Sequence, residues 1–370
     1  MAQGYNAEGG IITRTSDGRD LSDLWAELSQ VVAVYNERRQ KLIDLMTFSV
    51  TQNIEDVPQL GSDDFEEASE FGEPKGIRAA MTYFSMAYDF KWYDLAARFT
   101  WKFLADASSQ QIEAIHSSAL EADSRLVFQK VMSSVFNSAG RSATINQQNY
   151  NVYPLYNGDG TTPPAYKGNT FTDTHTHYLA SGNAAIDSGD LEAAYEHLRH
   201  HGYGIENGTQ IICMVNTQEA NVIRTFRANT ANNNSAVATY DFVPSTGQPT
   251  LIVPNMQGLI GSQPPSQWNG LPVIGSYGPM LIVVEDYIPA GYVLTFGTGG
   301  EGNLQNLVGF REHANTQLRG LRLIGGDKTG YPLIDSYYSR GFGTGIRQRG
   351  AGVVMQITSG SYTVPSAYSA

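Results

Sequence analysis

The sequence has one cysteine and no long hydrophobic run, and these two absences exclude several classes of protein. Cys213 is the only cysteine among 370 residues, so the chain has neither an internal disulfide framework nor a cysteine-based zinc site. We predict that it is a buried core residue, because residues 211–215 are all apolar.

No apolar run approaches the about 20 residues that span a bilayer. The N-terminal residues also lack the pattern of a signal peptide. We therefore expect a soluble protein with no membrane partner, made in a cytoplasm.

Charged residues are also scarce, and basic ones are the scarcer kind. They make up 16% of the chain, and the formal net charge is −12. This balance argues against a protein that grips nucleic acid through its phosphates. It is compatible with a protein that only encloses nucleic acid. The hydrophobic share of 41% is that of an ordered globular protein.

Motifs for nucleophilic catalysis are missing from the sequence. There is no GxSxG motif, no Walker A loop and no reactive-cysteine context. The segment Gly297-Thr-Gly-Gly-Glu-Gly302 matches GxGxxG, but Gly309 follows too soon for the helix that a dinucleotide site requires. We predict a loop there, and another glycine-rich turn at residues 341–345. The sequence thus predicts no catalytic residues, no cofactor and no enzymatic activity.

One group of histidines leaves an enzymatic alternative open. In Asp173-Thr-His-Thr-His177, alternate residues would share one face of a strand, so Asp173, His175 and His177 could converge on a metal. His197, His200 and His201 follow on an expected helix and could add ligands. Histidines that bond to the backbone or face solvent explain the same pattern, and HExxH is absent. We predict no metal site, and keep a metal-dependent enzyme using Asp173, His175 and His177 as an alternative.

Glycine and proline are distributed unevenly, which divides the chain into two parts. Residues 77–139 contain neither, whereas most of the 38 glycines and 15 prolines lie from residue 140 onward. The first part is typical of long helices and arms, and the second of short strands and turns. This segregation predicts an α+β protein.

The longest expected element is a helix over residues 108–136, about 45 Å in length. Its apolar residues recur at spacings of three to five: Ile112, Ile115, Ala119, Ala122, Leu126, Val131 and Val135. Residues 48–54 and 77–90 alternate like strands around an acidic, turn-rich segment, which predicts a long hairpin. The segment 91–103 is an aromatic bridge of ambiguous structure. Further helices are expected at 21–46 and 190–201, and strands at 209–215, 250–253, 280–284, 292–296 and 353–358.

Opposite charges gather in two distant regions. The hairpin segment is acidic, whereas residues 311–349 contain seven bases and three acids. We expect the two regions to pair between subunits. Each exposed pair contributes only ~0–1 kcal/mol, so only repetition over many interfaces would matter. The subunit-interface residues that we predict are Asp63, Asp64, Glu66, Glu67, Arg319, Arg322, Arg347 and Arg349.

The order of these elements resembles the major capsid proteins of tailed bacteriophages with the HK97 fold, of the actinobacterial-phage type. The resemblance covers nearly the whole chain, and none of its tracts is a catalytic signature. The tracts that carry it are Glu70-Phe-Gly-Glu-Pro-Lys-Gly76, Leu120-Glu-Ala-Asp-Ser-Arg125, Thr174-His-Thr-His-Tyr-Leu179, Gly202-Tyr-Gly204, Asn216-Thr-Gln-Glu-Ala220, Glu285-Asp-Tyr-Ile-Pro-Ala-Gly-Tyr292 and Gly309-Phe-Arg-Glu-His313.

The resemblance implies an α+β, HK97-like capsid fold. Its expected divisions are an N-terminal arm and helix at 1–46, an E-loop hairpin and bridge at 47–103, a P-domain with the spine helix at 104–184, an A-domain at 185–335, and C-terminal strands returning to the P-domain at 336–370. The implied function is a self-assembling shell protein of pentamers and hexamers, which forms an icosahedral head around double-stranded DNA without sequence-specific binding.

The implied partners are copies of the same chain, together with scaffolding, portal and decoration proteins. The implied location is the virion capsid, assembled in the bacterial host cytoplasm. Because only about 20 residues precede the first expected helix, the resemblance implies either a separate scaffolding protein or assembly without one. An encapsulin-like compartment around a cargo enzyme is the alternative within the same fold.

Overall fold

The computed structural model describes residues 12–37, 41–58, 67–68, 70, 72, 83–247, 263–325 and 333–369. The chain forms two compact units. Unit 1 comprises Met1–Gln40, Phe90–Lys130 and Arg311–Gly343, and unit 2 comprises Lys41–Asp89, Val131–Phe310 and Thr344–Ala370. Three of the five boundaries between the units fall inside continuous elements: helix α4 (Ser109–Phe136), strand β15 (Val308–Glu312) and strand β17 (Leu333–Ile346).

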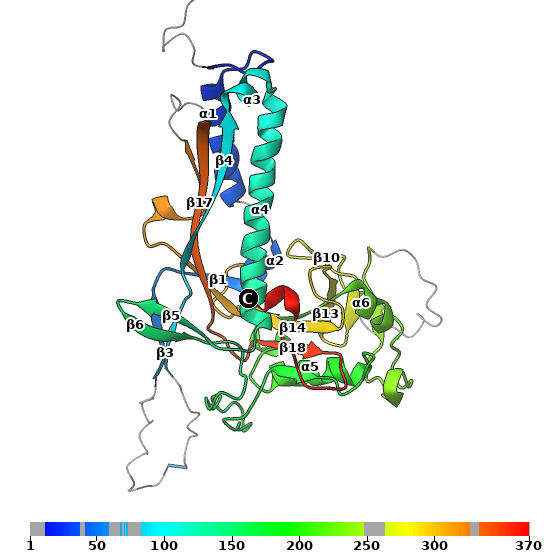
Figure 1. Cartoon of the computed structure of the whole chain (residues 1–370). Coiled ribbons are helices and arrows are strands. Elements are labelled where there is room, and N and C mark those ends of the chain that lie inside the picture. Colours follow the sequence, from blue (N-terminus) through cyan, green and yellow to red (C-terminus); the bar gives the residue numbers. More distant parts are fainter. Residues whose placement is uncertain are drawn as a thin grey trace, which may run out of the picture. The chain divides into compact units, whose positions relative to one another are not determined.

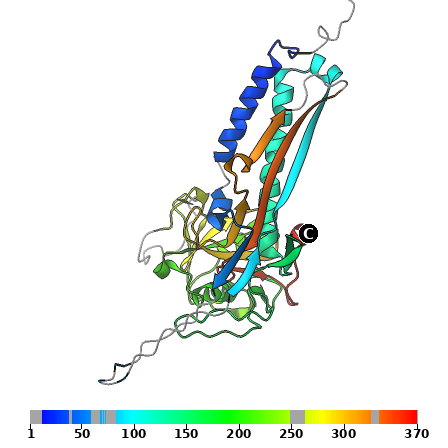
Figure 2. The same ribbon diagram turned by 90° about the vertical axis from the view of Figure 1, so that its left-hand side faces the viewer.

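Unit 1 is a layer of helices on a narrow antiparallel sheet. Strand β17 is paired on one side with β4 (Lys91–Thr100) and on the other with β16 (Leu321–Gly325). Helix α1 (Leu21–Glu37) and α4 run beside these strands (Figures 1 and 2). A short helix, α3 (Trp101–Asp106), continues from β4 and is capped by the Thr100 side chain. The helix–sheet contact buries two small clusters: Leu21, Leu24, Leu28, Phe99, Leu104 and Ile112, and Val32, Ala119, Leu321 and Tyr338.

Helix α4 confirms the predicted long helix, at about 42 Å for its 28 residues. Its buried face differs from the predicted one, however. Ile115 is 36% exposed, and the polar residues His116 and Asp123 are buried at 3% and 7%. The buried stripe thus runs through Ile112, His116, Ala119, Asp123 and Val127. The apolar spacing predicted the wrong buried face because two polar residues, His116 and Asp123, lie on the side of the helix that is buried.

The prediction of a glycine-rich turn at residues 341–345 was wrong, because these residues belong to the 14-residue strand β17. Their glycines make room for aromatic rings. A Cβ on Gly341 would lie 2.7 Å from the Trp92 ring, and one on Gly345 would lie 3.0 Å from the Tyr88 ring. The ambiguous aromatic bridge likewise contains strand β4, whose residues pair with β17 from Lys91 to Thr100.

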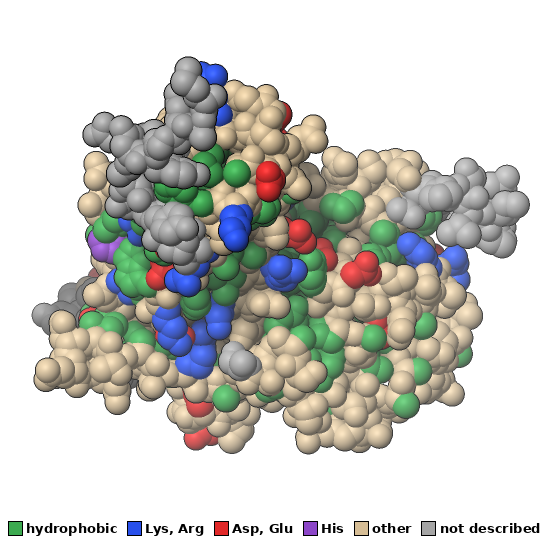
Figure 3. Space-filling view, turned by 45° about the horizontal axis from the view of Figure 1, so that its top comes forward, with side chains coloured by type: hydrophobic (Ala, Val, Ile, Leu, Met, Phe, Trp, Pro, Cys, Tyr) green, Lys and Arg blue, Asp and Glu red, His purple; other side chains and the backbone are tan. Residues whose placement is uncertain are grey.

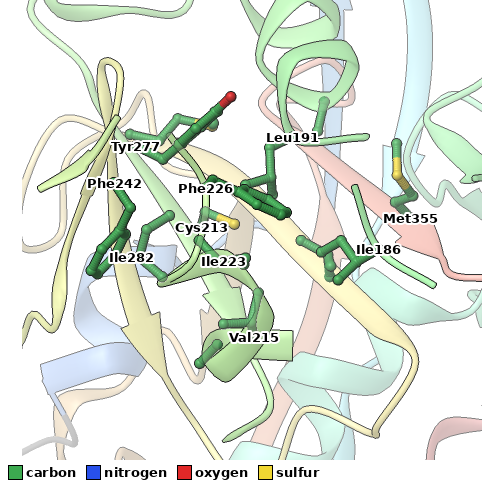
Figure 4. Packing of buried hydrophobic residues seen from close by; sticks show 14 of the residues in the cluster. Ile186, Leu191, Cys213, Val215, Ile223, Phe226, Phe242, Tyr277, Ile282 and Met355 are labelled. Carbon is green, nitrogen blue, oxygen red and sulfur yellow. The ribbon is translucent and has the colours of Figure 1, made fainter. Parts of the chain in front are cut away.

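Unit 2 is built on a seven-stranded mixed sheet in the order β7-β18-β14-β8-β13-β12-β9. Pairs β7/β18 and β8/β13 are parallel, and the other neighbours are antiparallel. The core is well packed around Cys213, Phe226 and Ile282, each fully buried (Figure 4). The strands are β7 (Tyr178–Ala180), β8 (Gln210–Val215), β9 (Phe242–Pro244), β12 (Gly275–Tyr277), β13 (Met280–Val284), β14 (Tyr292–Thr298) and β18 (Gly352–Gln356).

Two helices of unit 2 begin at polar caps. Helix α5 (Ser188–Arg199) starts with a capping box, in which Asp187 accepts from the Asp190 backbone and Asp190 accepts from the Asp187 backbone. After α5 the chain turns at Gly202, with φ +87°. A Cβ there would also lie 2.7 Å from the Tyr166 ring, so only glycine fits. Helix α6 (Thr217–Ile223) is capped by Asn216.

The base of the predicted hairpin is present in unit 2. Strands β2 (Ile54–Pro58) and β3 (Tyr83–Ala87) pair antiparallel, with Ile54 opposite Ala87 and Pro58 opposite Tyr83. Most of the segment between them lies outside the described residues. The remaining elements of unit 2 are α2 (Lys41–Met46), β1 (Thr47–Val50), the hairpin of β5 (Arg141–Ile145) and β6 (Gln148–Val152), and the pair β10 (Gln267–Trp268) and β11 (Leu271–Pro272).

Two other predictions can be compared with the structure, and a third falls outside the described residues. The helix expected over 21–46 is described as α1 and α2, with residues 38–40 outside the described part. The strand expected at 250–253 also lies outside it. The GxGxxG segment is a turn after β14, in which the Asn306 side-chain oxygen accepts from Thr298 Oγ1 at 3.0 Å and from Gly299 N at 3.1 Å. Among the described residues, none of the helices has the length and hydropathy of a membrane span.

Candidate assembly surfaces and a histidine cluster

The acidic residues predicted at the interface are mostly outside the described part of the chain. Asp63, Asp64 and Glu66 lie there, whereas Glu67 is described and exposed. The base of the hairpin that carries them is held within unit 2. Glu55 on β2 accepts a hydrogen bond from the Tyr88 hydroxyl at 2.7 Å and lies 2.8 Å from Arg347 Nε.

The four basic residues predicted at the interface differ in what they contact. Arg347 already pairs with Glu55 of its own chain. Arg349 is only 2% exposed, and its guanidinium donates to the Pro154 carbonyl at 2.9 Å and to Asp159 at 2.8 Å. Burial alone would raise the pKa of Asp159, but the Arg349 charge and the hydrogen bonds from Arg349 and Thr161 together outweigh it, and the pKa is lowered. Arg347 and Arg349 thus stabilise unit 2 itself.

Arg319 and Arg322, in unit 1, remain partly exposed. Arg319 donates to the His313 carbonyl at 2.8 Å and to the Ala314 carbonyl at 3.1 Å, which fixes its side chain against its own loop. The Arg322 guanidinium carbon lies 5.3 Å from the centre of the Trp92 ring. Neither residue has a carboxylate as a recorded ion-pair partner among the described residues. In Figure 3, several Lys and Arg side chains lie close together beside hydrophobic ones.

Buried polar side chains connect the helices and strands of unit 1. Asp123 on α4 forms an ion pair with Arg340 on β17, with side-chain exposures of 5% and 9%. The same carboxylate accepts from the Tyr35 hydroxyl of α1 at 2.9 Å. His116 Nδ1 lies 2.9 Å from the Tyr338 hydroxyl, and burial lowers the pKa of His116. These contacts explain why the core face of α4 tolerates polar residues.

The surface of unit 1 carries an unusual share of large apolar side chains. Among the described residues, more than half of the exposed large hydrophobic side chains belong to this smaller unit. Leu95 on β4 is 47% exposed, and Ile324 on β16 is 44% exposed. The others in unit 1 are Val31, Val34, Trp92, Ile115 and Tyr337. Exposed apolar surface of this kind marks contact sites for other proteins.

Four histidines of unit 2 converge, and we call His175, His177, His200 and His201 the histidine cluster. Each offers one ring nitrogen, and these nitrogens all lie within 4.8 Å of one another. The first two histidines precede β7, and the last two follow α5. Asp173 is exposed and does not belong to the group, because residues 173–177 form no strand. Of the residues that the sequence suggested as possible ligands, four histidines come together, whereas Asp173 and His197 lie outside the group.

Hydrogen bonds and ring contacts fix the cluster. His177 is fully buried, and its Nδ1 lies 2.7 Å from the Gly352 carbonyl oxygen of β18. His175 Nε2 lies 3.2 Å from His177 Nε2 and 3.0 Å from His201 Nε2. The Phe171 ring stacks on His201 at 4.2 Å between centroids.

The electrostatic environment keeps these rings neutral. Burial, together with the neighbouring imidazoles, lowers the pKa of His201 to about 3 and that of His200 to about 4. Burial also lowers the pKa of His175 and, more strongly, that of His177. At neutral pH each ring therefore has one nitrogen with a free lone pair.

The chain is similar to a protein of known structure from Mycobacterium phage Patience. The two are 49% identical, with a TM-score of 0.78, over 100% of this chain and 97% of that chain. A more distant likeness is to the asymmetric unit of the bacteriophage PhiM1 mature capsid, at 9% identity and a TM-score of 0.48 over 87% of this chain and 88% of that chain. Another is to the holo-SrpI encapsulin complex from Synechococcus elongatus PCC 7942, at 12% identity and 0.45 over 88% and 89%. These two likenesses do not separate a phage shell from an encapsulin. No family model and no curated protein matches the sequence.

The fold is that of a shell-building protein, with a hairpin, a long helix and a mixed sheet in the expected order. The close similarity along the whole chain is to a phage protein. The chain therefore belongs to the major capsid proteins of tailed bacteriophages with the HK97 fold, and the encapsulin alternative is less favoured. Its role is structural, in the multimeric shell of the virion capsid.

Proposed function

We propose that the chain assembles into hexamers and pentamers of an icosahedral head that encloses double-stranded DNA, and that it has no catalytic activity. The observation that carries this proposal is the set of exposed apolar side chains of unit 1, which includes Leu95 on one face of the sheet and Ile324 on the other. Repeated by symmetry, the burial of such a surface at each subunit contact contributes about 25 cal/mol per Å².

The expected domains of the family can be assigned to parts of this chain as a further proposal. The hairpin based on β2 and β3 corresponds to the E-loop, and α4 to the spine helix of the P-domain. The seven-stranded sheet of unit 2 corresponds to the A-domain together with the final strand, β18. The compact units are interleaved along the chain, so they do not follow the expected boundaries one by one.

The proposed charge pairing between subunits involves fewer basic residues than the sequence predicted. Arg347 and Arg349 already contact Glu55 and Asp159 in their own chain, which leaves Arg319 and Arg322 as the bases for a neighbour's hairpin. We propose that Glu67 and the adjacent Asp63, Asp64 and Glu66 reach them in the assembled shell. The negative net charge is compatible with DNA that is enclosed but not gripped.

The apolar surface is tested by the double variant Leu95→Ser/Ile324→Ser. We expect the unassembled protein to keep its unfolding free energy within about 0.5 kcal/mol, because these are surface positions. Shell formation, measured by sedimentation and negative-stain microscopy, should fall at least tenfold. The matched control is Ile205→Ser in unit 2, which is 62% exposed and should assemble normally. Normal assembly of the double variant would contradict the proposal.

The charge pairing is tested by reversal and rescue. Changing Asp63, Asp64, Glu66 and Glu67 to Lys should reduce shell yield, and Arg319→Glu/Arg322→Glu should restore part of it. No effect of the first change would exclude the pairing.

The contents of the shell are tested on particles made with the other phage assembly proteins in the bacterial host. Nuclease-protected double-stranded DNA would support the head, whereas a cargo protein would support an encapsulin. Exclusively small, discrete oligomers would overturn the assembly proposal.

A further inference from the structure

We propose that the histidine cluster binds one divalent transition-metal ion through four imidazole nitrogens, as a structural site inside unit 2. The cluster joins the residues before β7 to the turn after α5. The inference concerns the folded chain and does not depend on the proposed head assembly.

Two of the nitrogen–nitrogen distances in the cluster are close to those of a tetrahedral coordination shell. Zinc–imidazole bonds are about 2.0–2.1 Å long, so two ligands at the tetrahedral angle have nitrogens about 3.3–3.4 Å apart. His175 Nε2 lies 3.2 Å from His177 Nε2 and 3.0 Å from His201 Nε2. The His200 ligand atom lies within 4.8 Å of the other three. Small side-chain movements would therefore bring all four nitrogens to one ion.

Hydrogen bonds among the rings do not satisfy all three Nε2 atoms of His175, His177 and His201. A carbonyl oxygen only accepts, so His177 Nδ1 carries the proton that is donated to Gly352, and Nε2 of the neutral ring has a lone pair. His175 Nε2 has either one proton or one lone pair in the ring plane. It cannot donate to His177 and also accept from His201.

A cation between the rings removes this restriction on His175 Nε2, because it accepts a lone pair from every ring. His200 offers a further lone pair: its Nε2 is buried and has no hydrogen-bond partner among the described residues. The contact between His177 and Gly352 is the outer hydrogen bond that usually orients a metal-ligating imidazole. The stacked Phe171 ring restricts the orientation of His201.

The donor set indicates which metal is bound and what the ion does. Four imidazoles without a carboxylate or thiolate favour zinc, copper, nickel or cobalt over magnesium or calcium. Four protein ligands also complete a tetrahedral shell and leave no position for substrate or activated water. The geometry therefore favours a structural ion over the metal-dependent enzyme that uses Asp173.

Zinc binding is tested on the full chain, as shells and as unassembled protein. After chelator dialysis and reconstitution with Zn²⁺, elemental analysis should give about one zinc per chain. His175→Gln and His201→Gln should each lower that ratio at least tenfold. The matched control is His197→Gln, because His197 stacks near His175 at 5.8 Å but donates its Nδ1 proton to the Ala193 carbonyl. It should keep the wild-type ratio.

Wild-type protein without zinc after reconstitution would overturn the proposal, as would His175→Gln or His201→Gln with the wild-type ratio. Loss of zinc from His197→Gln would overturn the four-histidine assignment.

Two measurements on wild-type protein guard against variants that fail to fold. Co²⁺ in place of zinc should give the intense visible bands of four-coordinate cobalt, and weak six-coordinate bands would refute the geometry. Zinc should also raise the unfolding temperature of unit 2, since a ligand that binds only the folded state stabilises it. An unchanged unfolding temperature at saturating zinc would refute the structural role. Both readouts work on unassembled protein, so failed assembly and failed metal binding can be distinguished.

Discussion

Units 1 and 2 differ in how they bury apolar side chains. Unit 2 encloses a large cluster on its seven-stranded sheet, in which Phe226 and Ile282 are fully buried. Unit 1 has one helical layer on a narrow sheet, two small clusters and many exposed apolar residues. The buried pair Asp123–Arg340 supplies part of its internal cohesion. Unit 2 is therefore stable mainly through its own core, whereas unit 1 leaves apolar side chains exposed, where we propose that neighbouring subunits pack.

The sharpest test of this contrast is Arg340→Met in unit 1. The change leaves the Asp123 carboxylate buried without its cation, and we expect a loss of about 3–5 kcal/mol in unfolding free energy. Chemical denaturation of the unassembled protein measures it. The control is Arg98→Met, because Arg98 is 64% exposed and lies 3.6 Å from Asp335, where ~0–1 kcal/mol is expected. Equal losses would show that the buried pair does not hold unit 1 together.

Truncating one isoleucine in each unit compares the two cores directly. Ile282 in unit 2 and Ile112 in unit 1 are 0% and 1% exposed. We expect Ile282→Ala to cost about 4–5 kcal/mol and Ile112→Ala about 2–3 kcal/mol, because the thin layer of unit 1 can relax around the cavity. Denaturation midpoints of the unassembled variants measure both. If Ile112→Ala is the more damaging, unit 1 is as tightly packed as unit 2.

A buried acid makes the stability of unit 2 depend on pH. Burial raises the pKa of Asp190 to about 6, above the 3.8 of an unfolded chain, despite the opposing hydrogen bond from the Asp187 backbone. The stabilisation that protonated Asp190 gives to the folded protein is therefore complete below pH 3.8 and is lost as the pH rises through about 6. Relative to wild type, Asp190→Asn should gain about 1–3 kcal/mol between pH 4 and pH 7.

Unfolding temperatures of wild type and Asp190→Asn across this pH range give the measurement. Asp241→Asn, which changes an exposed carboxylate of the same unit, is the control. Parallel curves for wild type and Asp190→Asn would rule out the effect.

The smallest expected effect concerns the glycines of β17. In Gly341→Ala the new Cβ would lie 2.7 Å from the Trp92 ring, which we expect to cost about 1–2 kcal/mol. Gly325→Ala, on β16 of the same unit, is the control because no atom lies within 4 Å of its Cβ. A similar unfolding midpoint for both variants would mean that the ring moves aside freely.

Much of the fold was predictable where local pattern and tertiary packing agree. The long helix was predicted at 108–136 and lies at Ser109–Phe136, because its apolar spacing and the lack of glycine and proline are local properties. Its buried face was predicted less well. His116 and Asp123 are buried only because Tyr338 and Arg340, more than 200 residues away, bond to them. A single sequence does not show such distant partners.

The same reasoning explains the errors at β17 and at the histidines. Glycines 341 and 345 were interpreted as a turn, but their role is to accommodate Trp92 and Tyr88 from distant segments. The spacing of His175 and His177 was informative, and the expected helix did bring His200 and His201 near them. Asp173 was misassigned because period-two reasoning applies only to a strand, and the segment is a loop.

The interleaving of the units has a consequence for synthesis of the chain. Strand β4 is complete at Thr100, but its pairing partner β17 begins at Leu333. At about 5–20 residues per second, the ribosome needs on the order of 10–50 s to make the intervening residues. During that interval β4 has an unpaired edge beside the apolar Trp92 and Leu95, which favours aggregation of the nascent chain. Production of this protein in quantity is therefore expected to depend on chaperones that shield this strand until β17 emerges.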